Sequence, residues 1–291
     1  RTPISYMQSA FQERVKGELG SFHADELYKS YKKRFEKIES VFGEGSCDFW
    51  KFDPKAFRGS DVVLDFCDRL NIELGQVEIN RVNDSLSLNA LKLLFAYRKF
   101  GPGYGVGKNV VSENALLIRA LGSIGGGKLA LGGKLVRELL NQNKKDIQWM
   151  ESRLGESLDE EIAESDDSIY VEGDLLEIDP KSIDTLKKLI GQKELTDTIS
   201  GSTPQEVAQL VHILRNKLSG KPIHDGVLVN SSDNLSVQMP TSTKDSAVPQ
   251  NKIDASTLVT ALKSKDSKIL DGIPDRRAEQ IISDALRVIS S

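Results

Sequence analysis

The chain has few of the residues that build metal centres and disulfide frameworks. Its 291 residues include two cysteines and three histidines, which are Cys47, Cys67, His23, His212 and His224. The cysteines do not form a C-x-x-C pair and the histidines do not fall at metal-ligand spacing, so the sequence predicts no metal and no disulfide framework. Isolated cysteines are typical of proteins from a reducing compartment, so we expect a cytoplasmic protein.

Long apolar runs and a surplus of positive charge are also lacking. No stretch of roughly 18 apolar residues occurs, so the sequence predicts no transmembrane helix and no membrane partner. Hydrophobic residues make up 38% of the chain, charged residues make up 28%, and the net charge is −4. The low apolar share fits a folded part with polar extensions, and the acidic balance disfavours a protein whose main partner is nucleic acid.

Most of the chain has apolar residues at helical spacing. We expect helices over 3–17, 24–42, 87–97, 112–121, 133–154 and 204–218, and one after Ser60 whose apolar face holds Val63, Phe66, Cys67 and Leu70. Boundary signals support several of them: Ser60 and Ser87 are candidate N-caps, and Gly43 is a candidate stop. Thr203-Pro204-Gln205-Glu206 matches a capping box with a proline at the first helical position.

The predicted helix over 24–42 carries a stripe of Leu27, Tyr31, Phe35, Ile38 and Phe42, which we expect to be buried. Short apolar runs at 48–52 and 169–171 are the only segments that suggest strands.

Composition divides the chain into four predicted parts. Residues 1–158 form the first, and 159–220 form an acidic and helical extension. Residues 221–252 are rich in Ser, Thr, Asp, Asn and Pro, which predicts a linker that buries little surface. Residues 253–291 suggest a small helical hairpin.

The first nine residues have the layout of an anion site. Arg1 stands two positions before Pro3, and Ser9 follows within the first turns of the predicted helix. Pro3 suits a first helical turn, where its missing N–H would have no intrahelical partner. The helix dipole there favours negative charge, Arg1 offers a planar fork for a phosphate, and Ser9 offers a hydroxyl donor.

This R-x-P layout with Ser eight positions after Arg resembles the 3′-phosphate-binding motif of the P-loop sulfotransferases. Phe49–Pro54 with Asp61–Ile72 resembles a later strand-and-helix block of that family, and Arg81–Ser87 resembles the stretch that follows it in bacterial sulfotransferase-like proteins. The resemblance covers roughly residues 1–158. It implies an α/β, P-loop NTPase-like fold, seen here as a predominantly helical C-terminal portion with helical extensions.

The resemblance also implies a site and a reaction. Arg1 and Ser9 would bind the 3′-phosphate of 3′-phosphoadenosine-5′-phosphosulfate, the co-substrate, whose sulfuryl group passes to an acceptor hydroxyl or amine. The family's 5′-phosphosulfate loop and its usual catalytic base lie upstream of this motif, so the chain matches one half of the site and looks like the later part of something longer. The catalytic residues and the acceptor are therefore unassigned, and we expect the chain alone to be inactive.

Three further patterns have alternative interpretations. Gly122–Lys128 satisfies G-x-x-x-x-G-K, but Leu129 replaces the Ser or Thr that would reach Mg²⁺, which favours a helix-to-helix connection. Lys108 and Lys128 stay as candidate contacts to the nucleotide. The acidic run 156–167 lacks the ligand pattern of a calcium loop and suggests a solvated face.

Residues 269–281 resemble half of a helix-hairpin-helix. We expect a small helical hairpin there, used for docking or for oligomer contact, with binding to a nucleic-acid backbone as the less favoured alternative. For the chain as a whole, the alternative to a sulfotransferase-like protein is a non-enzymatic helical interaction or adaptor protein.

Overall fold

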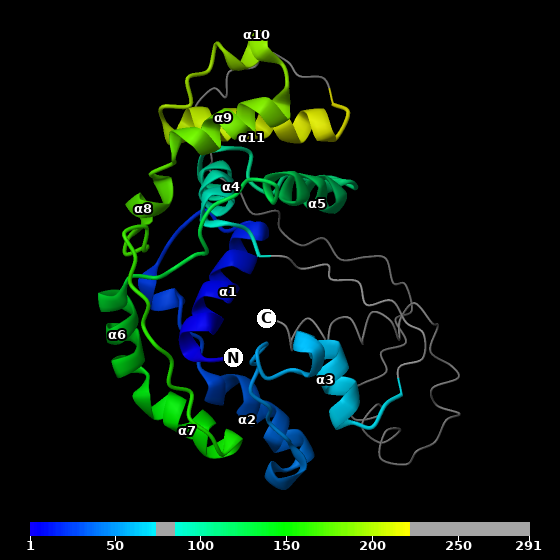
Figure 1. Ribbon diagram of the computed structural model, residues 1–291, viewed down its shortest axis with the longest axis vertical. Coiled ribbons are helices and arrows are strands. Elements are labelled where there is room, and N and C mark those ends of the chain that lie inside the picture. The colour runs from blue at the N-terminus through cyan, green and yellow to red at the C-terminus, as the bar shows by residue number, and fades with distance from the viewer. Residues whose placement is uncertain (74–84, 222–291) are drawn as a thin grey trace, which may run out of the picture. The chain divides into compact units, whose positions relative to one another are not determined.

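The computed structural model describes residues 1–73 and 85–221, and these form an almost entirely helical body (Figure 1). Within those ranges there is no β-strand, and the one bridge pair is Leu131 with Ile169. The predominantly helical prediction is confirmed, whereas no sheet of an α/β fold occurs in the described ranges. The helices are α1 Pro3–Lys16, α2 Tyr31–Phe42, α3 Val62–Arg69, α4 Leu88–Phe100, α5 Val110–Leu121, α6 Gly133–Gln142, α7 Lys144–Leu154, α8 Glu172–Leu176, α9 Pro180–Ile190, α10 Lys193–Thr196 and α11 Pro204–Leu218.

Local capping chemistry sets several helix starts as the sequence predicts. Ser87 Oγ accepts a hydrogen bond from the Ala90 backbone N–H at 3.1 Å, which starts α4. At α11, Thr203 Oγ1 accepts from Glu206 N at 3.2 Å and the Glu206 carboxylate accepts from Thr203 N at 3.2 Å. Gly43 ends α2 with a positive φ of 90°, a conformation that glycine adopts without steric cost.

Two predicted helices are interrupted. The segment 24–42 begins as a short 3-10 turn at Ala24–Glu26, and α2 starts only after Ser30, whose Oγ accepts from Lys33 N at 3.1 Å. The segment 133–154 divides at Asn143, which has φ −106° and ψ 14°. The Asn143 side chain donates to the Leu139 carbonyl at 2.8 Å and so satisfies the end of α6. The apolar period continues across both breaks. Leu27 and Tyr31 flank the first break, Leu139 and Met150 flank the second, and all four are buried in one core.

Two other predictions are wrong in detail. Asp61, and not Ser60, caps α3, with its carboxylate accepting from Val63 N at 2.8 Å. Residues 48–52 form no strand, since the described ranges hold no strand that could pair with them, and their aromatic side chains pack singly against other rings. Phe49 meets Phe35 at 5.4 Å between ring centroids, and Phe52 meets Phe57 at 4.9 Å.

The centre of the core is α4. Its side chains from Leu93 to Tyr97 are all completely buried, which fits its position between α1 and the layer of α9 and α11 (Figure 1). Helices from both sides of the predicted boundary at residue 158 therefore share one core, within a compact unit that spans Arg1–Leu228. The linker expected at 221–252 and the hairpin expected at 253–291 lie outside the described residues beyond Lys221.

The predicted apolar faces of α2 and α3 are only partly buried. Cys67 is buried, but Ile38 and Phe42 of α2 are exposed. Phe66 and Leu70 of α3 are exposed as well, because in the described part of the chain the main partner of α3 is the short turn Arg58–Ser60. No helix of the described ranges is long and apolar enough to cross a membrane.

Candidate functional site

The start of α1 brings the two predicted anion-binding side chains together. Thr2 is extended, with φ −61° and ψ 153°, and Pro3 then opens the helix. The Arg1 side chain extends along the first turns of α1, where its Nη1 donates a hydrogen bond to Ser9 Oγ. Because Ser9 acts as the acceptor in this contact, its own hydroxyl hydrogen is available for an anion placed beside the guanidinium.

An aromatic ring supports the guanidinium of Arg1. The guanidinium carbon lies 4.4 Å from the centroid of the Phe52 ring, a cation–π contact. Phe52 comes from the segment that forms no strand, and it is braced in turn by Phe57. Burial lowers the pKa of Arg1, while Glu13 and Tyr6 oppose that shift. One face of the guanidinium is thus covered, and one of its in-plane N–H groups, on Nη1, donates to Ser9.

Helix α2 contributes a hydroxyl and a second guanidinium to this region, beside the N-terminus (Figure 1). Tyr31 Oη donates to the Arg1 carbonyl oxygen at 2.8 Å, and Arg34 Nη1 donates to Tyr6 Oη at 2.8 Å. The rings of Tyr6 and Tyr31 lie 6.2 Å apart. Sequence reasoning missed Tyr31 and Arg34 as neighbours of the motif. Tyr31 belongs to the apolar stripe of an amphipathic helix, and nothing in the sequence distinguishes Arg34 from other charged residues of that helix.

Acidic groups lie close to the same helix end. The backbone N–H of Ser5 donates to Glu160 Oε2 at 3.3 Å, so a residue of the acidic run reaches the start of α1. Glu13, nearer the other end of α1, acts on the charge of the Arg1 side chain and forms an ion pair with Lys16 at 2.8 Å. The site is therefore a small basic and hydroxyl-bearing patch with carboxylates at its edge.

The glycine-rich segment Gly122–Lys128 is held by its carbonyl groups. The start of α4 donates three hydrogen bonds to it: Ser87 Oγ to Ile124 O at 2.6 Å, Leu88 N to Gly127 O at 2.7 Å, and Asn89 Nδ2 to Gly125 O at 3.2 Å. Helix α5 precedes it, where a phosphate loop would follow a strand. These contacts favour the helix-to-helix connection, and both Lys108 and Lys128 are exposed.

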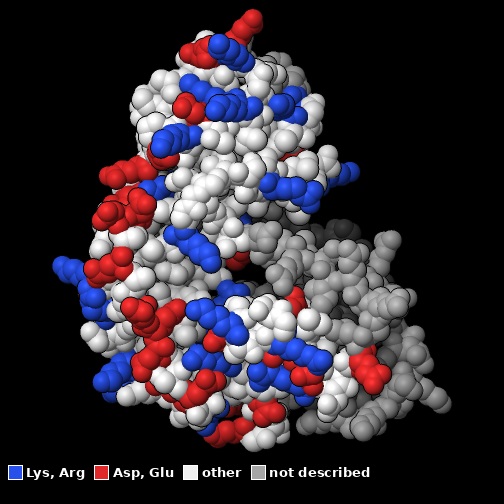
Figure 2. Space-filling view, viewed as in Figure 1, with Lys and Arg blue, Asp and Glu red and all other residues white. Residues whose placement is uncertain are grey.

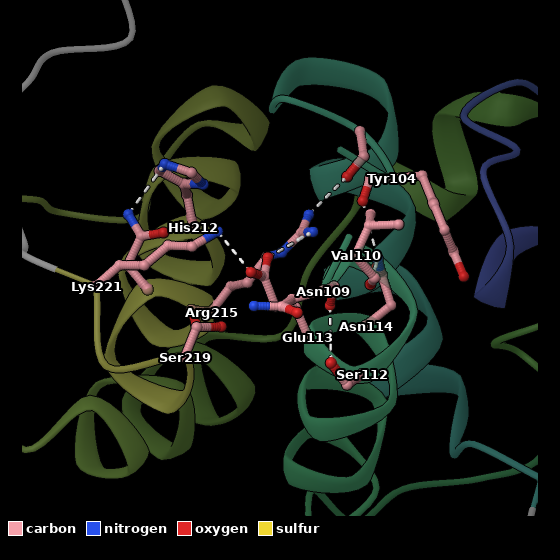
Figure 3. Close-up of polar contacts among 12 residues, drawn as sticks. Tyr104, Asn109, Val110, Ser112, Glu113, Asn114, His212, Arg215, Ser219 and Lys221 are labelled. Carbon is pink, nitrogen blue, oxygen red and sulfur yellow. Dashed lines mark hydrogen bonds and ion pairs between the residues drawn. The ribbon is translucent and has the colours of Figure 1, made fainter. Parts of the chain in front are cut away.

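A larger polar cluster joins α5 to α11 (Figure 3). Arg215 Nη2 lies 3.2 Å from Glu113 Oε2, and Lys221 Nζ lies 2.6 Å from the other oxygen of that carboxylate. His212 is half-buried and stacks on Tyr97, with ring centroids 6.1 Å apart. Burial lowers the pKa of His212, with Arg215 and Lys221 adding to that shift. The charged groups of this cluster are paired with each other, so we interpret the cluster as a structural link between α5 and α11.

The remaining predictions concern metals, charge and the tail. In the described ranges, no group of three or more His, Cys, Asp or Glu side chains is placed to hold a metal ion, and Cys47 and Cys67 are both unbridged thiols. Positive and negative side chains are interspersed over the face drawn in Figure 2. The half helix-hairpin-helix at 269–281, His224 and residues 81–84 of the resemblance lie outside the described residues.

Comparison with known proteins identifies no relative of this chain. No protein-family model matches the chain, and no curated protein or solved structure matches it. Function is therefore inferred from the motif of Arg1 and Ser9 and from the side chains that surround it.

Proposed function

We propose that this chain supplies the 3′-phosphate-binding half of a sulfotransferase-like nucleotide site. The intact site would transfer a sulfuryl group from 3′-phosphoadenosine-5′-phosphosulfate to an acceptor. The observation that carries the proposal is the contact between Arg1 and Ser9, which stand eight residues apart and meet on one face of α1. A P-loop NTPase-like position for these helices in the complete fold is part of the same proposal.

The chemistry of the pair suits a phosphate dianion. The guanidinium of Arg1 carries charge and several coplanar N–H groups, which bind two phosphate oxygens at once. Ser9 adds a neutral donor on the adjacent side. Phe52 covers one face of the guanidinium, which keeps water from that face and limits the directions in which the side chain points. The pair therefore offers a preorganised site for an anion of this size.

In such a reaction these residues bind and orient the nucleotide. Group transfer between phosphate or sulfate esters is accelerated chiefly by positioning and by stabilisation of developing charge. A firmly held 3′-phosphate fixes the nucleotide, and thereby the distant sulfuryl group, relative to the acceptor. Arg1 and Ser9 are accordingly proposed as co-substrate-binding residues, and no side chain of the chain is proposed as the catalytic base.

The test is a titration of the chain with adenosine 3′,5′-bisphosphate, in which binding is measured by calorimetry or by thermal shift. A charge-assisted hydrogen bond is worth about 1.5–3 kcal/mol, so Arg1→Ala should weaken binding by roughly 10- to 150-fold. Ser9→Ala removes a neutral donor and should weaken binding by about 2- to 10-fold. Adenosine 5′-monophosphate, which lacks the 3′-phosphate, should show no dependence on Arg1.

The matched control is Arg14→Ala, at the other end of α1, where the arginine pairs with Glu26 at 2.8 Å. It removes the same charge from the same helix and should leave the affinity unchanged. If Arg1→Ala and the unaltered chain bind the bisphosphate equally well, the proposed nucleotide site is wrong.

A second candidate function is that of a helical interaction module, favoured by the exposed apolar side chains of α2 and α3. Phe66 and Leu70 are 38% and 47% exposed, although their sequence pattern is that of a buried face. Exposed apolar side chains in such a group are typical of contact surfaces. Sedimentation velocity of the chain and of a Phe66→Asp variant, over a range of concentrations, tests self-association through this face. If the face is a contact surface between copies, the unaltered chain should associate and the Phe66→Asp variant should be monomeric.

A further inference from the structure

A carboxylate on α7 caps the helix that approaches Arg1. Asp146 lies in the first turn of α7, yet its side chain accepts four hydrogen bonds from the segment that opens α2. The donors are Tyr28 Oη at 2.7 Å, Ser30 Oγ at 2.5 Å, Tyr31 N at 2.7 Å and Lys32 N at 3.1 Å. The last two are N–H groups of the first turn of α2, which have no partner inside that helix. Asp146 therefore fixes the start of α2 from outside it.

Tyr31 extends this contact to Arg1. Its backbone N–H is held by Asp146, and its hydroxyl donates to the Arg1 carbonyl oxygen at 2.8 Å. The ring is 7% exposed and packs against Tyr28 and Tyr6, with centroids 6.2 Å away in each case. Burial, with the Tyr6 hydroxyl and the Asp146 carboxylate nearby, raises the pKa of Tyr31, so the hydroxyl stays protonated and remains a donor.

The two tyrosines beside Asp146 differ in one useful respect. The Tyr28 hydroxyl donates its hydrogen bond to the Asp146 carboxylate, whereas the Tyr31 hydroxyl donates to the backbone carbonyl of Arg1. Arg1 precedes the first helical residue, so no intrahelical hydrogen bond fixes its direction on the N-terminal side. A donor to its carbonyl group limits the directions in which the guanidinium can reach toward Ser9.

We infer that Asp146 and Tyr31 are positioning residues for the anion site, with Asp146 orienting α2 and the Tyr31 hydroxyl orienting Arg1. This inference rests on the proposed function, because it assigns the two residues to the same 3′-phosphate site. Neither side chain touches the anion in this scheme. Both act through the backbone of Arg1, and their removal should change affinity without changing the groups that bind the phosphate.

The experiment compares Tyr31→Phe with Tyr28→Phe in the full chain, with adenosine 3′,5′-bisphosphate as the probe. Each variant removes one hydroxyl from a buried ring and keeps the ring. We expect Tyr31→Phe to weaken binding by about 2- to 10-fold, the range that one neutral hydrogen bond supports. Tyr28→Phe should bind within about twofold of the unaltered chain. Thermal unfolding of both variants checks that they fold to a similar extent.

A double-mutant cycle separates positioning from general stability. In an Arg1→Ala background there is no guanidinium to orient, so Tyr31→Phe should cause no further loss of affinity. Asp146→Asn, which keeps an oxygen acceptor but removes the charge, should lose less affinity than Asp146→Ala. If Tyr31→Phe binds like the unaltered chain, or adds its full loss in the Arg1→Ala background, the inference fails while the nucleotide site stands. If the unaltered chain and Arg1→Ala bind equally, the proposed function and this inference both fail.

Discussion

Replacement of Arg98 should destabilise the described body more than any replacement of a surface charge. Arg98 lies on α4, where it is 6% exposed and donates to four oxygens. The acceptors are Val15 O at 3.1 Å, Lys16 O at 2.9 Å, Gly103 O at 2.9 Å and Asn114 Oδ1 at 2.9 Å. A single side chain thus ties the end of α1, the loop after α4 and helix α5 to the central helix.

The expected magnitude follows from what the substitution leaves behind. Val15 and Lys16 lie in the last turn of α1, where carbonyl groups have no intrahelical donor. Arg98→Ala leaves these two carbonyls and Asn114 Oδ1 without the donor that Arg98 provides, whereas Gly103 O keeps a hydrogen bond from Arg215 Nη1 at 3.3 Å. Burial lowers the pKa of Arg98 to about 10, so the side chain is still charged at neutral pH and its bonds are charge-assisted. A buried acceptor that is left without its donor costs about 1–3 kcal/mol, so the loss of the Arg98 hydrogen bonds is large against a typical total stability of about 5–15 kcal/mol.

The assay is urea denaturation of Arg98→Ala, followed by far-ultraviolet circular dichroism, with stability taken from the midpoint and slope. Arg14→Ala is the matched control, because Arg14 forms an exposed ion pair with Glu26 and such pairs contribute about 0–1 kcal/mol. Arg98→Lys keeps one charge but cannot reach four acceptors, so it should fall between the two. A loss for Arg98→Ala below about 1 kcal/mol, no greater than for Arg14→Ala, would refute the reasoning.

Two further predictions concern carboxylates. Hydrogen bonds from Ser200 and Ser202 and from the cap of α11 lower the pKa of Glu206 to about 2. The ionised carboxylate therefore stabilises the fold fully above its unfolded-state pKa of about 4.3, and this stabilisation is lost as the pH falls toward 2. The difference in unfolding free energy between the unaltered chain and Glu206→Gln, measured by urea denaturation, should therefore shrink from pH 5 to pH 2, and a difference that is constant with pH would contradict this. Glu160→Gln removes a negative charge beside Ser5 at the start of α1, so it should strengthen bisphosphate binding by about 2- to 3-fold in the same titration as Arg1→Ala, and an unchanged or weaker affinity would speak against competition by this carboxylate.

Helix starts with their own capping side chains could be predicted from the sequence. Ser87 caps α4 and Thr203 with Glu206 caps α11, through contacts within three residues, and Pro3 opens α1 through its own fixed φ. Such contacts depend on side chains that are neighbours along the chain, so their outcome does not require the rest of the fold. Period and cap likewise place the apolar residues of α11 on one face, and this face is buried because α11 packs against α4 and α9.

Contacts between segments that are distant along the chain could not be predicted from the sequence. The aromatic run at 48–52 has the composition of a strand, but no neighbouring strand pairs with it in the described ranges, and its rings pack singly. The exposure of Ile38 and Phe66 has the same origin, because a periodic stripe states which residues share a face and not whether another element covers it. Arg98 and Arg215 read as ordinary helix surface and are buried only because α1, α5 and α11 close over them.

The candidate site shows the same division. The sequence by itself determined that Arg1 and Ser9 stand eight residues apart around a proline-started helix, and helical geometry then makes contact between a long and a short side chain on one face possible. Only the tertiary structure decided what surrounds them: Phe52 under the guanidinium, Tyr31 on the Arg1 carbonyl, and Asp146 behind Tyr31. The physical reason is range, because a helix and its caps are fixed by neighbours along the chain, whereas support from residues tens to more than a hundred positions away depends on how separate helices pack.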